Sequence, residues 1–148
     1  MEHHPVVIVH SFGEAVAGLA EAQAIGRGVT LLSAPGAALY AGCGWWRALV
    51  EAARAKYPDV PCTDVLDCAD GTGQALAALR IGLTRLVLWP DAPGREAIVT
   101  IAQSLGGFVL PAPPPAAAVM RPSHRPAEAK SGPRNEPSGN GDKTRLPG

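Results

Sequence analysis

Two carboxylates stand close together in residues 63–83, TDVLDCADGTGQALAALRIGL. Asp67 and Asp70 lie three residues apart around an expected turn. Carboxylate oxygens are ligands that Mg²⁺ prefers, so the pair is a candidate metal site that water and an anionic substrate would complete. The structural alternative is that Asp70 caps the following helix while Asp67 accepts hydrogen bonds from turn amides. We favour this structural alternative.

Gly71, Thr72 and Gly73 open the helix expected after this turn. Glycines at a helix N-terminus let backbone amides approach an anion closely. The stretch is much shorter than a Walker loop or a dinucleotide fingerprint, and no Lys follows it. The neighbouring carboxylates also repel a phosphate unless a metal ion lies between them. We keep these residues as ligand-binding candidates and leave the cofactor unassigned.

Cys68 is the candidate nucleophile of the same stretch. A thiol near a helix N-terminus can have a lowered pKa, and His10 is expected at the end of a neighbouring strand. Asp67 and Asp70 act in the opposite sense, because nearby negative charge disfavours the thiolate. The simpler interpretation is a small buried residue. Asp67, Cys68 and His10 are therefore catalytic candidates, and whether the protein is an enzyme stays open.

Short apolar runs alternate with helical patterns between residues 5 and 110. The expected strands are residues 6–10, 29–32, 62–67, 85–89 and 108–110, and four helices separate them. Ser11, with Glu14 three residues later, predicts a capping box at the first helix. Glycine or proline follows each helical pattern, as is typical of a helix end.

Continuous apolar strands separated by helices favour an α/β fold whose parallel sheet is buried on both faces. We predict a five-stranded, mainly parallel sheet in a Rossmann-like or flavodoxin-like three-layer sandwich. An open half (β/α) barrel is the alternative, because every unit repeats helix, glycine and strand. The strand order is left open.

In parallel α/β sheets, ligands bind beyond the carboxyl ends of the strands. The residues expected at this edge supply a ligand-binding set of Ser11, Ser33, Asp67, Asp70, Gly71, Thr72 and Gly73. His10, Cys68, Trp89 and Asp91 are expected at the same edge. The rule predicts a location for the site, and the substrate or ligand is left open.

Residues 35–44 form a charge-free, glycine-rich loop that leads to Trp45 and Trp46. Trp46 fits the inward face of the next helix, whereas Trp45 is rotated by about 100° and is expected to be partly exposed. This tryptophan and its loop are a candidate lid or homodimer contact. Packing of Trp45 on its own loop is the structural alternative.

The composition changes at Pro111, and from this residue onward nine of the fifteen prolines occur without any aromatic residue. Such a segment cannot bury enough apolar surface to offset its ordering entropy. We therefore predict a frayed N-terminus at residues 1–4, an α/β domain at residues 5–110 and a disordered Pro-rich tail at residues 111–148.

Charge and hydropathy restrict the class of partner. Residues 121–148 carry six Lys and Arg against three Asp and Glu, too weak an excess for an arm that binds nucleic acid. Residues 28–46 are free of charge but are interrupted by glycine and proline, so we expect a strand and a loop and no membrane span. Three cysteines without a CxxC spacing predict reduced thiols in a cytoplasmic protein.

The segments LDCADGTGQALAALRIG and LLSAPGAALYAG resemble a group of small uncharacterised bacterial α/β proteins. The resemblance covers about residues 5–110 and implies the domain boundary. It implies no activity.

Three hypotheses follow from these patterns. The leading one is a cytoplasmic α/β domain that binds a small ligand or a partner at the carboxyl ends of its strands. The second is an enzyme that uses Asp67 and Asp70 with a metal ion, or Cys68 with His10. The third is a non-catalytic homo-oligomer that associates through Trp45 and residues 35–44.

Overall fold

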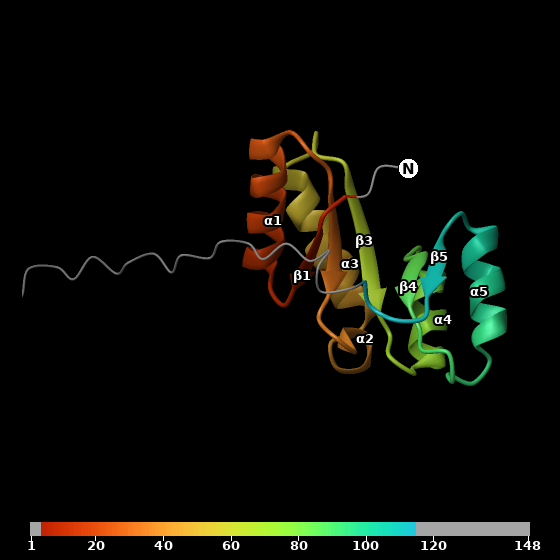
Figure 1. Cartoon of the computed structure of the whole chain (residues 1–148). Helices are drawn as coiled ribbons and strands as arrows, with labels where there is room; N and C mark the ends of the chain where they lie inside the picture. The colour runs from red at the N-terminus through yellow and green to blue at the C-terminus, as the bar shows by residue number, and fades with distance from the viewer. Residues whose placement is uncertain (1–3, 115–148) are drawn as a thin grey trace, which may run out of the picture.

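The computed structural model describes residues 4–114, in which strands and helices alternate along the chain (Figure 1). The predicted tail lies outside the described residues from position 115 onward, as do three of the four residues predicted to be frayed. The strands are β1 (Val6–Val9), β2 (Val29–Ser33), β3 (Cys62–Asp67), β4 (Arg85–Val87) and β5 (Phe108–Leu110). The helices are α1 (Phe12–Ile25), α2 (Ala37–Tyr40), α3 (Cys43–Lys56), α4 (Thr72–Arg80) and α5 (Arg95–Ser104).

Local sequence signals explain where the first helix begins and ends. Ser11 is extended at the N-cap, and its Oγ accepts a hydrogen bond from the amide of Glu14 at 3.3 Å, which satisfies one of the free donors of the first turn. Gly26 ends α1 with a left-handed φ of 69°, a conformation that glycine adopts without steric cost. The predicted cap is confirmed, although the Glu14 carboxylate accepts from the amide of His10 and completes no capping box with Ser11.

One expected loop was wrong, and two element boundaries differ from the prediction by two residues. The segment predicted as a loop contains the single-turn helix α2, and α3 begins at Cys43, two residues before the predicted start at Trp45. Strand β4 ends at Val87, so Leu88 and Trp89 already belong to the connection that follows it. The residues after Gly36 are rich in alanine, which favours a helical turn. The prediction missed this turn because the surrounding proline and glycines indicated a loop.

The predicted five-stranded parallel sheet is confirmed, and its strands lie in the order β1-β2-β3-β4-β5. Every neighbouring pair is parallel, for example with Val7 beside Leu31 and Leu66 beside Leu86. Each crossover therefore moves one strand further in the same direction, and the order never reverses. A doubly wound sheet has a reversal point at which ligands bind, and this sheet has none.

Successive right-handed crossovers in one direction place their helices on one face of the sheet. The contacts agree with this arrangement, because α1 packs on α3, α3 on α4 and α4 on α5. The main core contains residues of these helices together with strand residues such as Val7, Leu31 and Leu66. A second cluster contains only strand residues. Within the confirmed fold class, the strand order and the two clusters agree with the open half-barrel arrangement.

The core is aliphatic apart from one large aromatic side chain. Trp46 is fully buried in α3, as its helical position predicts, and its indole N–H has no hydrogen-bond partner in the part of the chain that the structure describes. Among residues 4–114 no helix combines the length and the apolar character needed to cross a membrane.

Candidate functional site

The carboxyl ends of β1, β2, β3 and β4 meet at one edge of the sheet, which we call the carboxyl edge. In Figure 1 this edge is the lower one, where the arrowhead of β3 points toward α2. Helix α2 contacts both β3 and α4, so the loop and the acidic turn that the sequence singled out lie against each other. The carboxyl edge thus brings together two stretches that are well separated in the chain.

Ser33 and Asp67 are buried at the carboxyl edge, where the Ser33 side chain connects the end of β2 to the end of β3. The Oγ of Ser33 accepts a hydrogen bond from the amide of Asp67 at 2.8 Å and donates to the carbonyl of Ala34 at 3.3 Å. The carboxylate Oδ1 of Asp67 accepts from the amide of Ala69 at 2.9 Å. The prediction that Asp67 binds a turn amide is confirmed. Both polar side chains therefore hold the turn in place.

The predicted cap by Asp70 was wrong. The N-cap position of α4 is Gly71, which has no side chain, and no side-chain hydrogen bond caps this helix. Asp70 instead contributes its backbone carbonyl, which accepts from the amide of Thr72 at 3.1 Å. The helix begins one residue later than the capping pattern requires, so the Asp70 side chain is exposed at the edge.

The turn between β3 and α4 is held by backbone contacts to the neighbouring connection. Ala69 adopts a positive φ of 48°, a conformation that costs a residue with a Cβ on the order of 1 kcal/mol. Its carbonyl accepts from the amide of Trp89 at 2.8 Å, and the amide of Cys68 donates to Val87 at 2.9 Å. A Cβ on Gly71 would lie 2.5 Å from the Leu39 side chain, so α2 rests directly on this turn.

Cys68 is fully buried, and its Sγ lies 3.8 Å from the carbonyl of Leu66. Burial, reinforced by the negative charge of Asp67, raises the pKa of the Cys68 thiol to about 12. A nucleophilic cysteine needs the opposite shift. His10 is exposed at the end of β1, with β2 between it and β3, and its ring contacts Glu14. The structure therefore does not bring these two catalytic candidates together.

The remaining predicted residues divide between structural contacts and open surface. Ser11 caps α1, and the hydroxyl of Thr72 donates to the carbonyl of Pro93, which ties α4 to the segment before α5. A Cβ on Gly73 would meet nothing within 4 Å, so this glycine faces open space. No group of three or more potential metal-ligating side chains occurs within residues 4–114.

The carboxyl edge carries a set of exposed aromatic and aliphatic side chains, of which the sequence interpretation had singled out only Trp45 and Trp89. Trp45 was expected to be partly exposed there, and it is. Four further residues share its exposure and its place at or just after the strand ends: Phe12, Leu39, Tyr40 and Trp89. Phe12 opens α1, Leu39 and Tyr40 belong to α2, and Trp89 follows β4. We call these five residues the apolar rim. Leu39 and Tyr40, two large apolar residues in a predicted loop, were the signal that could have identified it.

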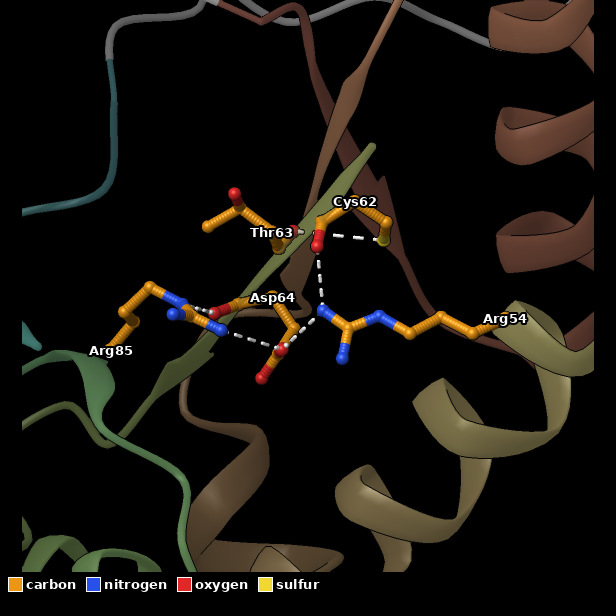
Figure 2. Close-up of polar contacts among 5 residues, drawn as sticks. All are labelled: Arg54, Cys62, Thr63, Asp64 and Arg85. Carbon is orange, nitrogen blue, oxygen red and sulfur yellow. Dashed lines mark hydrogen bonds and ion pairs between the residues drawn. The ribbon is translucent and has the colours of Figure 1, made fainter. Parts of the chain in front are cut away.

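A second polar feature, also overlooked, lies toward the other end of β3. Figure 2 shows the guanidinium groups of Arg54 and Arg85 converging on Asp64 from α3 and β4. One carboxylate oxygen of Asp64 lies 2.9 Å from Arg54 Nη2 and 3.2 Å from Arg85 Nη2. Asp64 is buried, whereas the side chains of Arg54 and Arg85 are 38% and 32% exposed. A charged residue within an apolar strand was the sequence signal for this cluster.

The register of the sheet explains why two arginines lie here. Strand β4 pairs with β3 only from Leu66 onward, so the preceding half of β3 lacks a strand partner on that side. Arg54 Nη2 donates to the carbonyl of Cys62 at 2.7 Å, and Arg85 Nε donates to the carbonyl of Asp64 at 3.2 Å. The arginines therefore satisfy carbonyls that a longer β4 would have bonded. This is a structural function that needs no ligand.

The amino edge of the sheet, opposite the carboxyl edge, also carries a surface cavity of about 680 Å³. Its lining includes His4, Gln23, Arg27 and Asp59. Ser33, Asp64 and Asp67 are the buried polar residues of the described chain, and none of them lines this cavity. This cavity therefore marks the amino edge as an alternative site, but the buried polar side chains and the apolar rim lie elsewhere. We give the carboxyl edge more weight, because a binding site needs fixed polar groups beside apolar surface.

No protein-family model matches the sequence, and neither does any curated protein. The chemistry of the site must therefore be inferred from its own residues. The carboxyl edge combines a rigid turn, exposed aromatic faces and the exposed carboxylates of Asp70 and Asp91. Such a surface can bind apolar and positively charged groups, because aromatic faces and carboxylates both attract cations.

Proposed function

We propose that this protein is a non-catalytic binding domain that holds a small organic cation at the carboxyl edge of its sheet. The observation that carries the proposal is the apolar rim, with four aromatic side chains exposed along the same edge of the sheet as the acidic turn. Several large apolar side chains exposed along one edge are typical of a binding surface. The three cysteines of the described chain are free, which supports a reducing compartment such as the cytoplasm.

The ligand class follows from the side chains at the carboxyl edge. Aromatic rings attract a cation above their faces by about 0.5–2 kcal/mol each, more as water is excluded. Asp70 and Asp91 are exposed beside Trp89, and the guanidinium of Arg95 is engaged by the carbonyl of Leu88 at 2.8 Å. The helix N-termini at this edge carry partial positive charge, which these carboxylates offset. A ligand with a flat apolar body and one positive charge fits this combination best.

Tryptophan fluorescence tests the proposal without a known natural ligand. Benzyltrimethylammonium is the probe, and neutral benzyl alcohol is the matched compound without the charge. We expect saturable quenching by the ammonium compound and at least about fivefold weaker binding of the alcohol, which corresponds to about 1 kcal/mol. Trp45 and Trp89 are the exposed reporters, whereas Trp46 is buried.

Two variants locate the binding. Phe12→Ala removes a rim side chain without removing a reporter, and we expect it to weaken binding of the ammonium probe at least about threefold. Phe108→Ala removes an aromatic residue of similar exposure at the start of β5, outside the rim, and should leave binding unchanged. Absence of saturable quenching, or equal effects of the two variants, would contradict the proposal. A dimer seen by light scattering that Tyr40→Ala abolishes would assign the rim to self-association instead.

A further inference from the structure

A smaller surface cavity, of about 210 Å³, lies beside the polar cluster of Figure 2. Its charged lining includes Arg47 and Arg54 from α3, Arg85 from β4 and the buried Asp64 from β3. The rest of the lining consists of Val50, Glu51, Ile81, Gly82 and Leu83. Arginines from a helix and from a strand therefore meet around one cavity.

The local structure explains why these side chains gather here. Arg47, Glu51 and Arg54 follow one another at spacings of four and three residues, so they share one face of α3. Arg85 is the first residue of β4. Arg54 and Arg85 reach the carboxylate of Asp64 from opposite sides (Figure 2). The helix and the strand thus hold their arginines on either side of one buried acid.

Structural contacts occupy only part of the hydrogen-bond donors around the cavity. A guanidinium group carries five N–H donors. Arg54 and Arg85 each use two of them, on backbone carbonyls and on the carboxylate of Asp64. Arg47 donates from Nη1 to the carbonyl of Ile81 at 3.1 Å. The other guanidinium N–H groups have no hydrogen-bond partner among residues 4–114, so donors remain for a ligand.

The charges that line the cavity favour an anion. Three guanidinium groups and two carboxylates line it, which leaves an excess of one positive charge. Arg54 and Arg85 share a single oxygen of Asp64, so one negative charge serves two cations. Glu51 lies 3.7 Å from Arg47 and its side chain is 68% exposed, so water weakens this ion pair. An added anion would therefore restore the balance of charge.

We propose that this cavity binds one phosphate group, either as the free ion or as part of a small phosphate ester. Arginine donates paired N–H groups that match the spacing of phosphate oxygens. The double charge of phosphate also gives it a stronger attraction to the guanidinium groups than a carboxylate has. Pockets for whole drug-sized ligands usually hold about 300–1,000 Å³, so we expect the cavity to enclose the charged group alone. No residue of the apolar rim lines it, so this site is separate from the carboxyl edge.

Isothermal titration calorimetry with inorganic phosphate tests the proposal, with chloride added to keep the ionic strength constant. We expect saturable binding with a Kd of about 1 mM or tighter. Acetate should bind at least about threefold more weakly, because it carries one charge. Phenyl phosphate distinguishes the two sources of the group: tighter binding than that of phosphate assigns the cavity to an ester, and weaker binding assigns it to the free ion. Absence of saturation, or equal binding of acetate, would overturn the proposal.

Three variants locate the binding, and two of them should act in opposite directions. Arg47→Gln removes donors and a positive charge, and we expect it to weaken phosphate binding at least about fivefold. Glu51→Gln removes the competing carboxylate from the same helix face and should tighten binding at least about twofold. Arg80→Gln removes an exposed positive charge that does not line the cavity, so it should change the Kd by less than about 1.5-fold.

The contrast between the variants separates a built site from attraction to the overall charge of the protein. All three residues are exposed on helices, so the substitutions leave the core intact. Equal weakening by Arg47→Gln and Arg80→Gln would show that phosphate responds to overall charge, and it would contradict the site. Weaker binding in Glu51→Gln would contradict it as well.

Discussion

Asp64 is the residue whose role depends most on partners that are distant in the sequence. It lies on β3, and its carboxylate is shared by Arg54 from α3 and Arg85 from β4. The two guanidinium groups also bond the otherwise unpaired carbonyls of Cys62 and Asp64. The three side chains thus connect α3 and β4 to the part of β3 that β4 leaves unpaired.

Asp64→Asn should destabilise the protein by about 2 kcal/mol, because two guanidinium groups lose their negative partner while the side chain keeps its shape. Breaking a buried ion pair costs about 3–5 kcal/mol, and partial exposure of both arginines reduces this figure. Urea unfolding measures the difference. Glu51→Gln removes an exposed pair with Arg47. This control should cost less than about 0.5 kcal/mol. A loss of the same size in both variants would contradict the structural role of Asp64.

The buried thiol of Cys68 predicts a stability that falls at alkaline pH. Its pKa is raised from the ordinary 9.0 to about 12 by burial and by Asp67, so the folded state holds this proton more tightly than the unfolded state. The resulting stabilisation is complete below about pH 9 and is lost as the pH rises toward 12. The free energy of unfolding should therefore decrease more in wild type than in Cys68→Ala between about pH 8 and pH 11. A constant difference between the two proteins would argue against this burial.

Reaction with iodoacetamide at about pH 7.5 tests the catalytic alternative for the same residue. We expect Cys68 to be labelled more than about 100-fold more slowly in the folded protein than in urea, because the thiol is inaccessible and protonated. Mass spectrometry of the labelled peptide identifies the site. Fast labelling of Cys68 in the folded state would revive the nucleophile hypothesis.

At the scale of elements, close packing between chain segments decides which glycines can be replaced. A Cβ on Gly107 would collide with the carbonyl oxygen of Thr84, a backbone atom that cannot move without shifting β4. The amide of Phe108 also donates to this carbonyl at 3.0 Å, which fixes the start of β5. A Cβ on Gly73, in the first turn of α4, would meet nothing within 4 Å.

Gly107→Ala should therefore cost about 3 kcal/mol, because it forces β5 away from β4. Gly73→Ala should be neutral or should stabilise the protein by up to about 1 kcal/mol, since alanine favours the helix. Thermal and urea unfolding of both variants measure the contrast. The opposite order of stabilities would show that β5 does not pack against β4 as described.

At the scale of the whole molecule, one core spans the whole sheet. It extends from Val7 on β1 to Ala102 on α5, so the strands on either side of β3 share one set of buried side chains. We expect unfolding to be a single cooperative transition, with coincident urea curves from tryptophan fluorescence and far-ultraviolet circular dichroism. Separate transitions, with β4, α5 and β5 unfolding first, would show that the chain folds as two units that meet at the short β3–β4 pairing.

The element pattern was largely predictable, because its signals are local. Apolar runs, Ser11 as a cap and a glycine or proline after each helix predicted five strands and four of the helices in the correct order. Trp46 was correctly expected to be buried. The single-turn α2 was missed because proline and glycine suggested a loop, and the Asp70 cap was wrong because the helix starts one residue later.

The sequence by itself determined the parallel α/β class, the positions of the elements and the buried turn around Asp67. These properties depend on residues near one another in the chain, and hydrophobic periodicity and capping chemistry report them directly. The tertiary structure alone decided the unreversed strand order, the arginines around Asp64, the apolar rim at the carboxyl edge and the packing of the described helices on one face of the sheet. Each of these depends on contacts between distant segments, and a single sequence carries no pairwise signal for such contacts.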